Sequence, residues 1–130
     1  MLKIFRWALL WALCILVLCL IPGQALPEWD WFSLLDLDKL VHAGMFGVLA
    51  VLLADALRKR DGLSRYVLMG CLLSIAYGVA TELMQGLEAM GRRTDPSDVV
   101  ANTVGALIGV LYVRWRQRAG KAIVPVAFMR

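Results

Sequence analysis

The sequence predicts an all-α integral membrane bundle of four helices with both termini in the cytoplasm. Hydrophobic residues make up 61% of the 130 residues and charged residues only 18%, whereas charged residues average about a quarter in soluble domains. The apolar residues gather in four stretches, and a transmembrane helix needs roughly 20 such residues. Four helices of that length use most of the chain, so we expect a single membrane domain over residues 1–130.

The four expected spans cover, in order, residues of about 4–21, 37–57, 66–87 and 97–115. The first is short, begins beside Lys3 and Arg6, and stops at Pro22. A basic start followed by a short apolar run is also typical of a secretory signal peptide. Whether this span is retained or cleaved therefore stays open at the level of sequence, and the other spans are unaffected by the answer.

Charged and helix-breaking residues mark the ends of the other spans. The second ends at the basic run that starts with Arg58, and a polar loop containing Pro96 separates the third from the fourth. Residues 116–130 form a basic cytoplasmic tail. Its apolar piece, residues 122–129, is too short to cross a bilayer.

The distribution of lysine and arginine predicts the orientation. Eleven of these residues lie on the side of the two termini and three on the other, and cytoplasmic loops carry the excess in membrane proteins. We therefore expect a multi-pass membrane protein with both termini in the cytoplasm. Membrane topology accounts for the basic residues that give the chain its net charge of +4. The basic residues do not line a polar helix or an aromatic-bearing strand, so we expect no nucleic acid as a partner. The expected partners are membrane lipids. Whether the protein forms homo-oligomers stays open.

Ionisable and amide side chains lie near one end of three spans. They are Asp38, Lys39 and His42 in the second; Glu82 and Gln85 in the third; and Asp98 and Asn102 in the fourth. Successive spans run in opposite directions, which places all of them in the outer leaflet. Spacings of three or four residues put each group on one helix face. Because polar groups at membrane depth are costly and mark functional sites, we expect these faces to meet in an outward-facing polar pocket.

Two further features of the sequence bear on this pocket. The loop before the fourth span places Arg92 and Arg93 above it, and a guanidinium matches carboxylate or phosphate. In the same loop, Thr94, Asp95 or Ser97 is expected to cap the fourth helix. Small residues at helical spacing are expected to bring the three helices together: Gly44, Gly47, Gly78, Gly86, Ala101, Gly105 and Gly109.

Three ordered motifs resemble the VanZ-like family of small bacterial membrane proteins. They are DKLVHAGMF at 38–46, ELMQ at 82–85 and RRTDPSDVVANTVGALIG at 92–109, and the resemblance covers about residues 36–115. It implies functional roles for the polar residues named above, with an arginine at 92 or 93. The family namesake is associated with resistance to the glycopeptide antibiotic teicoplanin, which implies a role at the cell envelope.

The leading functional hypothesis is that the pocket recognises or modifies an envelope glycan or a lipid-linked precursor. His42, Glu82 and Asp98 are the candidate catalytic residues, because a histidine beside carboxylates can transfer protons. The candidate substrate-binding residues are Asp38, Lys39, Gln85, Arg92, Arg93 and Asn102. No G-x-S-x-G nucleophile motif is present, and whether any reaction is catalysed stays open.

Two other hypotheses remain. Imidazole and carboxylates also suit a divalent cation, but the sequence shows no paired histidine or cysteine spacing, so no metal is expected and the cofactor is unknown. Alternatively, the protein is a non-catalytic structural or partner-binding membrane protein, and its polar cluster only fixes helix packing.

Overall fold

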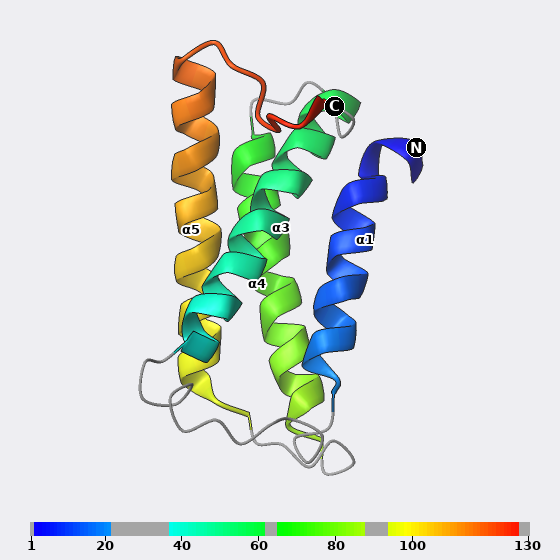
Figure 1. The fold of residues 1–130 in the computed structure, drawn as a ribbon, viewed down its shortest axis with the longest axis vertical. Coiled ribbons are helices and arrows are strands. Elements are labelled where there is room, and N and C mark those ends of the chain that lie inside the picture. Colours follow the sequence, from blue (N-terminus) through cyan, green and yellow to red (C-terminus); the bar gives the residue numbers. More distant parts are fainter. Residues whose placement is uncertain (1, 22–36, 62–64, 88–93, 128–130) are drawn as a thin grey trace.

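A computed structural model of the chain describes residues 2–21, 37–61, 65–87 and 94–127. Within these ranges it contains four helices and no strand: α1 (Leu2–Cys19), α3 (Leu37–Asp61), α4 (Tyr66–Gln85) and α5 (Pro96–Arg118). Each helix is long and apolar enough to cross a membrane. The predicted fold class, an all-α four-helix membrane bundle, is confirmed (Figure 1). The orientation of the termini relative to the membrane stays a prediction.

Two helices extend beyond the ends of the predicted spans. α3 continues past residue 57 through its basic run to Asp61, and α5 continues to Arg118, inside the segment predicted as a tail. Basic side chains interact favourably with the carboxyl end of a helix and can reach water from there. A basic run therefore marks where the hydrocarbon ends and not where the helix ends. Near this end of α3, Lys59 Nζ lies 2.6 Å from Asp55 Oδ2.

Glycines allow α3 and α5 to pack with their backbones close together. A Cβ atom built on Gly105 would collide with the backbone of Ala43, and one on Gly109 would lie 2.6 Å from the carbonyl oxygen of Gly47. Small residues permit this approach in lipid, so the packing role predicted for these positions is confirmed. Gly44 differs, because a Cβ there would meet nothing within 4 Å.

Hydrogen bonds join α1 to α3 and α4. Three side chains donate to main-chain carbonyl oxygens across these contacts: Trp11 Nε1 to Met45 at 2.9 Å, Tyr77 Oη to Ala12 at 2.7 Å, and Gln85 Nε2 to Cys19 at 2.9 Å. Backbone and amide groups in hydrocarbon need such partners. α1 is therefore integrated in the bundle as a membrane helix would be.

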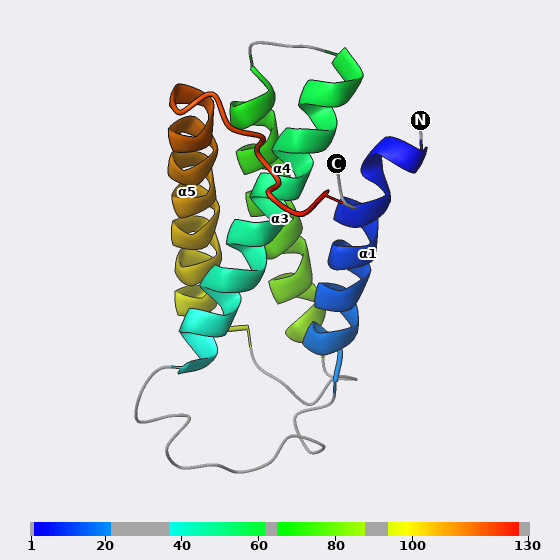
Figure 2. The same ribbon diagram turned by 45° about the horizontal axis from the view of Figure 1, so that its top comes forward.

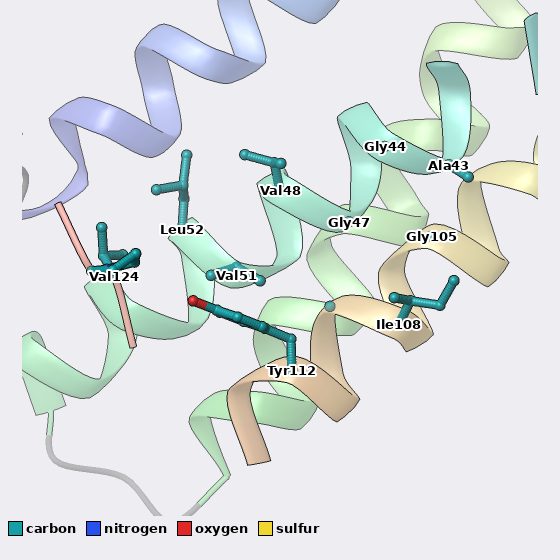
Figure 3. Close-up of a pocket in the computed structure, with 12 residues that line it drawn as sticks. Ala43, Gly44, Gly47, Val48, Val51, Leu52, Gly105, Ile108, Tyr112 and Val124 are labelled. Atoms are coloured by element: carbon teal, nitrogen blue, oxygen red, sulfur yellow. The ribbon is translucent and has the colours of Figure 1, made fainter. Parts of the chain in front are cut away.

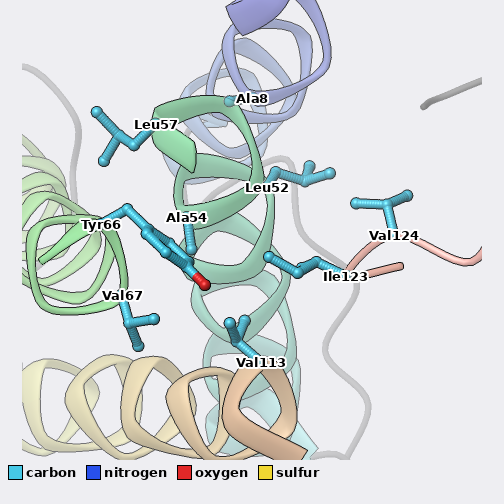
Figure 4. Close-up of a cluster of buried hydrophobic side chains, with 9 residues drawn as sticks. All are labelled: Ala8, Leu52, Ala54, Leu57, Tyr66, Val67, Val113, Ile123 and Val124. Carbon is cyan, nitrogen blue, oxygen red and sulfur yellow. The ribbon is translucent and has the colours of Figure 1, made fainter. Parts of the chain in front are cut away.

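The segment after α5 folds back over the bundle (Figure 2). Gly120 has a φ of 62°, and the N–H groups of Gly120 and Lys121 donate to the carbonyls of Gln117 and Arg116. This is the Schellman arrangement that ends many helices. The turn directs Ile123 and Val124, 1% and 5% exposed, into an apolar cluster with side chains from all four helices (Figure 4): Ala8, Leu52, Ala54, Leu57, Tyr66, Val67 and Val113.

Candidate functional site

The polar residues of α3, α4 and α5 meet at one end of the bundle. His42 lies in the second turn of α3, Glu82 in the last turn of α4, and Asp98 and Asn102 in the first two turns of α5. α4 runs antiparallel to α3 and α5, so the end of one helix lies beside the beginnings of the others (Figure 1). These four residues form what we call the polar cluster. Their grouping follows from the antiparallel order that the sequence predicted.

His42 is at the centre of the polar cluster. Its Nδ1 atom lies 3.1 Å from Asn102 Oδ1 and 4.0 Å from Glu82 Oε1. Its Nε2 atom lies 4.0 Å from Asp98 Oδ2. One ligand-type atom from each of His42, Glu82 and Asp98 lies within 4.8 Å of the others. The imidazole of His42 therefore contacts the amide of Asn102 on α5 and faces two carboxylates, Glu82 on α4 and Asp98 on α5.

The contact with Asn102 defines the tautomer of His42. The amide oxygen of asparagine only accepts hydrogen bonds, so at 3.1 Å the Nδ1 of His42 must be the donor. In a neutral imidazole the other nitrogen then carries the lone pair. The Nε2 lone pair of His42 is thus presented on the side of Asp98, where it can accept a proton or bind a cation.

The polar cluster is almost closed to its surroundings. Glu82 and Asn102 are each 1% exposed, while His42 is 8% and Asp98 is 9% exposed. The small opening therefore lies at His42 and Asp98, the two residues nearest the start of α3 and α5. Burial of two carboxylates is costly unless charge or hydrogen bonding compensates it, and His42 is an ionisable group that faces both.

The start of α5 beside the cluster is capped by Asp95. Asp95 Oδ1 accepts from the Ser97 hydroxyl at 2.7 Å and from the Ser97 N–H at 2.9 Å, with Pro96 following the cap. The hydroxyl bond, and next the backbone bond, lower the pKa of the Asp95 carboxyl. Capping was predicted for Thr94, Asp95 or Ser97, and Asp95 performs it. Thr94 Oγ1 donates to the Glu82 carbonyl at 3.4 Å and ties this cap to α4.

The structure separates the other predicted site residues into three groups. Asp38 and Lys39, half-buried on the first turn of α3, lie near enough for their charges to act on Asp98. Gln85 is 2% exposed and its amide nitrogen bonds Cys19 of α1. Arg92 and Arg93 lie outside the described residues. The functional assignment of all these residues stays a prediction.

An apolar groove lies beside the polar cluster, between α3 and α5 (Figure 3). Its volume is about 500 Å³. It begins at Ala43, the residue after His42, passes Gly44 and Ile108, and reaches Leu52 and the C-terminal segment at Val124. The nine helical steps from Ala43 to Leu52 correspond to a rise of about 14 Å. The sequence predicted a polar pocket here and missed this apolar one.

Gly44 was the available signal for the groove. Because Gly44 has no side chain, space is left open beside α3. At Gly47, Gly105 and Gly109, backbone atoms of the facing helix occupy the position that a Cβ atom would take. Sequence alone does not distinguish a glycine that packs from one that leaves a hollow, because both occur at the same helical spacing.

A family model described as VanZ/LLP1 matches residues 9–117 of the chain. No curated protein and no solved structure matches the chain. The matched region includes most of α1, all of α3 and α4, and nearly all of α5. Every residue of the polar cluster lies within it, and it extends beyond the sequence motifs to include the first helix.

Proposed function

Because the chain belongs to the VanZ/LLP1 family, we propose that it recognises or modifies a lipid-linked envelope precursor at the polar cluster. The protein would do so as a multi-pass protein of the bacterial cytoplasmic membrane. The association of the family namesake with teicoplanin resistance makes glycopeptide susceptibility the expected cellular readout. A family name does not determine chemistry, so the support must come from the site.

The observation that carries this proposal is the proximity of the polar cluster and the apolar groove along α3. His42 belongs to the cluster and Ala43, the next residue, lines the groove. Ligand sites combine an apolar wall with a few placed polar groups. An amphiphile would lay its headgroup at the cluster and its hydrocarbon chain along α3 and α5. This favours a lipid-linked ligand over a soluble glycan.

The expected orientation supports the same ligand class. With eleven basic residues on the side of the termini and three on the other, the cluster end would face outward. Lys39 lies on the first turn of α3 at this end, where its ammonium group can attract an anionic headgroup. An outward site is where a lipid-linked envelope precursor is accessible.

The chemistry available at the cluster is proton transfer or binding of a headgroup oxygen. The Nε2 lone pair of His42 can accept a proton, and Glu82 and Asp98 would stabilise the resulting imidazolium. Recognition without a reaction would use the same groups as hydrogen-bonding partners. Both forms of the proposal make His42 and Glu82 necessary.

The test compares substitutions at the cluster with a substitution at the other end of α3. The protein is purified, inserted in bilayer discs and assayed for binding of extracted envelope lipids, and a strain producing it is assayed for teicoplanin susceptibility. We expect His42→Ala and Glu82→Gln to abolish both effects, while Asp55→Asn retains them. If the folded cluster variants bind lipid and alter susceptibility like the unmodified protein, the proposal is wrong.

A second pair of variants tests the groove. Gly44→Leu places a side chain in space that is open in the structure, so it should weaken lipid binding without disturbing helix packing. Ala80→Leu adds the same side chain on an exposed face of α4 and serves as the control. Equal lipid binding by both variants would exclude the groove as the site of the hydrocarbon chain.

The hydrogen bond between His42 and Asn102 favours one alternative. It joins α3 to α5 inside the bundle, so the cluster can serve to fix helix packing alone. That function predicts that His42→Ala and Glu82→Gln lower the thermal stability and membrane accumulation of the protein. Normal stability together with lost lipid binding would reject it.

A further inference from the structure

We infer that the polar cluster binds one divalent transition-metal ion through His42, Glu82 and Asp98. The sequence favoured no metal, because it has a single histidine and no paired cysteine spacing. The folded chain favours a metal site, because it brings one ligand atom from each of three helices to within 4.8 Å of the others. Binding of the ion is independent of the proposed function, whereas its use on a headgroup rests on that function.

The distances around His42 match metal ligation better than hydrogen bonding. Nε2 is 4.0 Å from Asp98 Oδ2, which is too far for a direct hydrogen bond. Bonds from zinc to imidazole nitrogen or carboxylate oxygen are about 2.0–2.2 Å each. Two such bonds that meet at a tetrahedral angle hold their ligand atoms about 3.4 Å apart, so an ion requires each side chain to move by only a few tenths of an ångström.

The state of Asp98 is a second observation that points to a cation. This residue is only 9% exposed, and its Oδ1 atom is buried without a hydrogen bond to any residue in the described ranges. Its Oδ2 atom faces the lone pair of His42 Nε2, so two electron-rich atoms confront each other. A positive ion between them removes the repulsion and satisfies the carboxylate.

Asn102 provides the outer support that metal-binding histidines usually have. Such histidines donate their second ring N–H to a neighbouring oxygen, which fixes the tautomer and orients the ring. Here Nδ1 of His42 donates to Asn102 Oδ1 at 3.1 Å. The amide therefore holds Nε2 in the form that ligates a metal.

The donor set indicates a divalent ion. Imidazole with carboxylates suits zinc and neighbouring transition metals, and three protein ligands leave a coordination position open. In the proposed function, a phosphate or carbonyl oxygen of the lipid headgroup would take this position.

The experiment uses Co²⁺ as a spectroscopic probe. The full chain is purified in detergent with a histidine-free tag, stripped with EDTA, dialysed and titrated with Co²⁺. We expect visible absorption that saturates at one equivalent and disappears when Zn²⁺ is added. Asp98→Asn and Glu82→Gln should each weaken binding by more than about tenfold. Asp55→Asn, whose carboxylate pairs with Lys59, should bind like the unmodified protein.

Helical circular dichroism and the melting temperature show that each variant is folded before its titration is interpreted. Absence of Co²⁺ absorption in the unmodified protein would overturn the inference, as would unchanged binding in both folded variants. An intense near-ultraviolet thiolate band would also overturn it, because it would place the ion on the cysteines.

The same preparation separates this inference from the proposed function. Co²⁺ binding without any binding of envelope lipid would support the metal site and contradict the lipid-linked ligand. Lipid binding that is equally strong with EDTA and with Zn²⁺ would contradict the role of the ion in recognition and leave the lipid proposal intact.

Discussion

Asn102 determines which nitrogen of His42 is available to a ligand. Its amide oxygen accepts from Nδ1 at 3.1 Å and so leaves the lone pair of Nε2 facing Asp98. Asn102 is 1% exposed and lies on a different helix from the histidine. A residue first considered for substrate binding thus acts here through the orientation of another side chain.

Replacement of Asn102 should therefore destabilise the bundle as well as alter the site. Asn102→Leu keeps a side chain of similar size but leaves the buried Nδ1–H of His42 without its acceptor. The expected loss is about 1–2 kcal/mol in the free energy of unfolding, measured by titration with SDS in mixed micelles. Thr103→Val is the matched control on the same helix, because the Thr103 hydroxyl donates to the Val99 carbonyl of its own helix. Equal stability of the two variants would contradict the role assigned to Asn102.

Residue spacing predicted part of this site and failed for the rest. The four-residue spacing of Asp98 and Asn102 placed both on one face of α5, and they do meet His42. Gln85 shares a face of α4 with Glu82 by the same rule, yet its amide bonds Cys19. Spacing identifies a helix face but does not say which neighbour covers each part of it, and α1 covers the part that holds Gln85.

The contact between α3 and α5 depends on the absence of side chains at defined positions. Gly105 of α5 lies against the backbone of Ala43 in α3. Gly44, the residue after Ala43, faces open space in the groove. Helix periodicity predicts that both glycines share a small-residue pattern. Only the helix crossing itself decides which of them is in contact.

These two glycines should respond oppositely to the same substitution. Gly105→Ala forces α3 and α5 apart, and overpacking of this kind costs about 1–3 kcal/mol. Gly44→Ala meets open space and gains helix propensity, so its stability should be unchanged or slightly higher. Thermal unfolding in detergent measures both. A stable Gly105→Ala protein would show that the helices do not approach as described.

The C-terminal segment connects regions of the chain that are far apart in sequence. Ile123 and Val124 pack with Ala8 of α1 and Leu52 of α3 in one apolar cluster. The sequence indicated only that this piece is too short to span a membrane. Its docking depends on the turn at Gly120 and on an apolar cluster contributed by the assembled helices, and neither is visible in a hydropathy pattern.

Truncation of a docked side chain should reveal this contact. Ile123 is 1% exposed and Val126 is 39% exposed. Ile123→Ala should lower the free energy of unfolding by about 2–5 kcal/mol, and Val126→Ala should have little effect. Chemical unfolding of both variants in micelles is the measurement. Similar stabilities would mean that the segment is not docked in solution.

The role of α1 leads to a prediction about processing. Because Tyr77 and Gln85 bond main-chain carbonyls of α1, we expect this helix to remain in the mature protein. Intact-mass spectrometry of protein isolated from bacterial membranes should then give about the 14.4 kDa of the full chain. A species shortened by the first 20 or so residues, the usual length of a signal peptide, would show that the helix is removed.

The C-terminal segment also limits how far the apolar groove extends. Val124 and Pro125 line its far end, opposite Ala43. A hydrocarbon chain anchored by its headgroup at His42 can follow the groove for only about 14 Å of helix rise before it reaches this stop. Anything longer must leave sideways into the bilayer. In the proposed function, the groove would therefore hold only the first part of a lipid tail and would accept tails of any greater length.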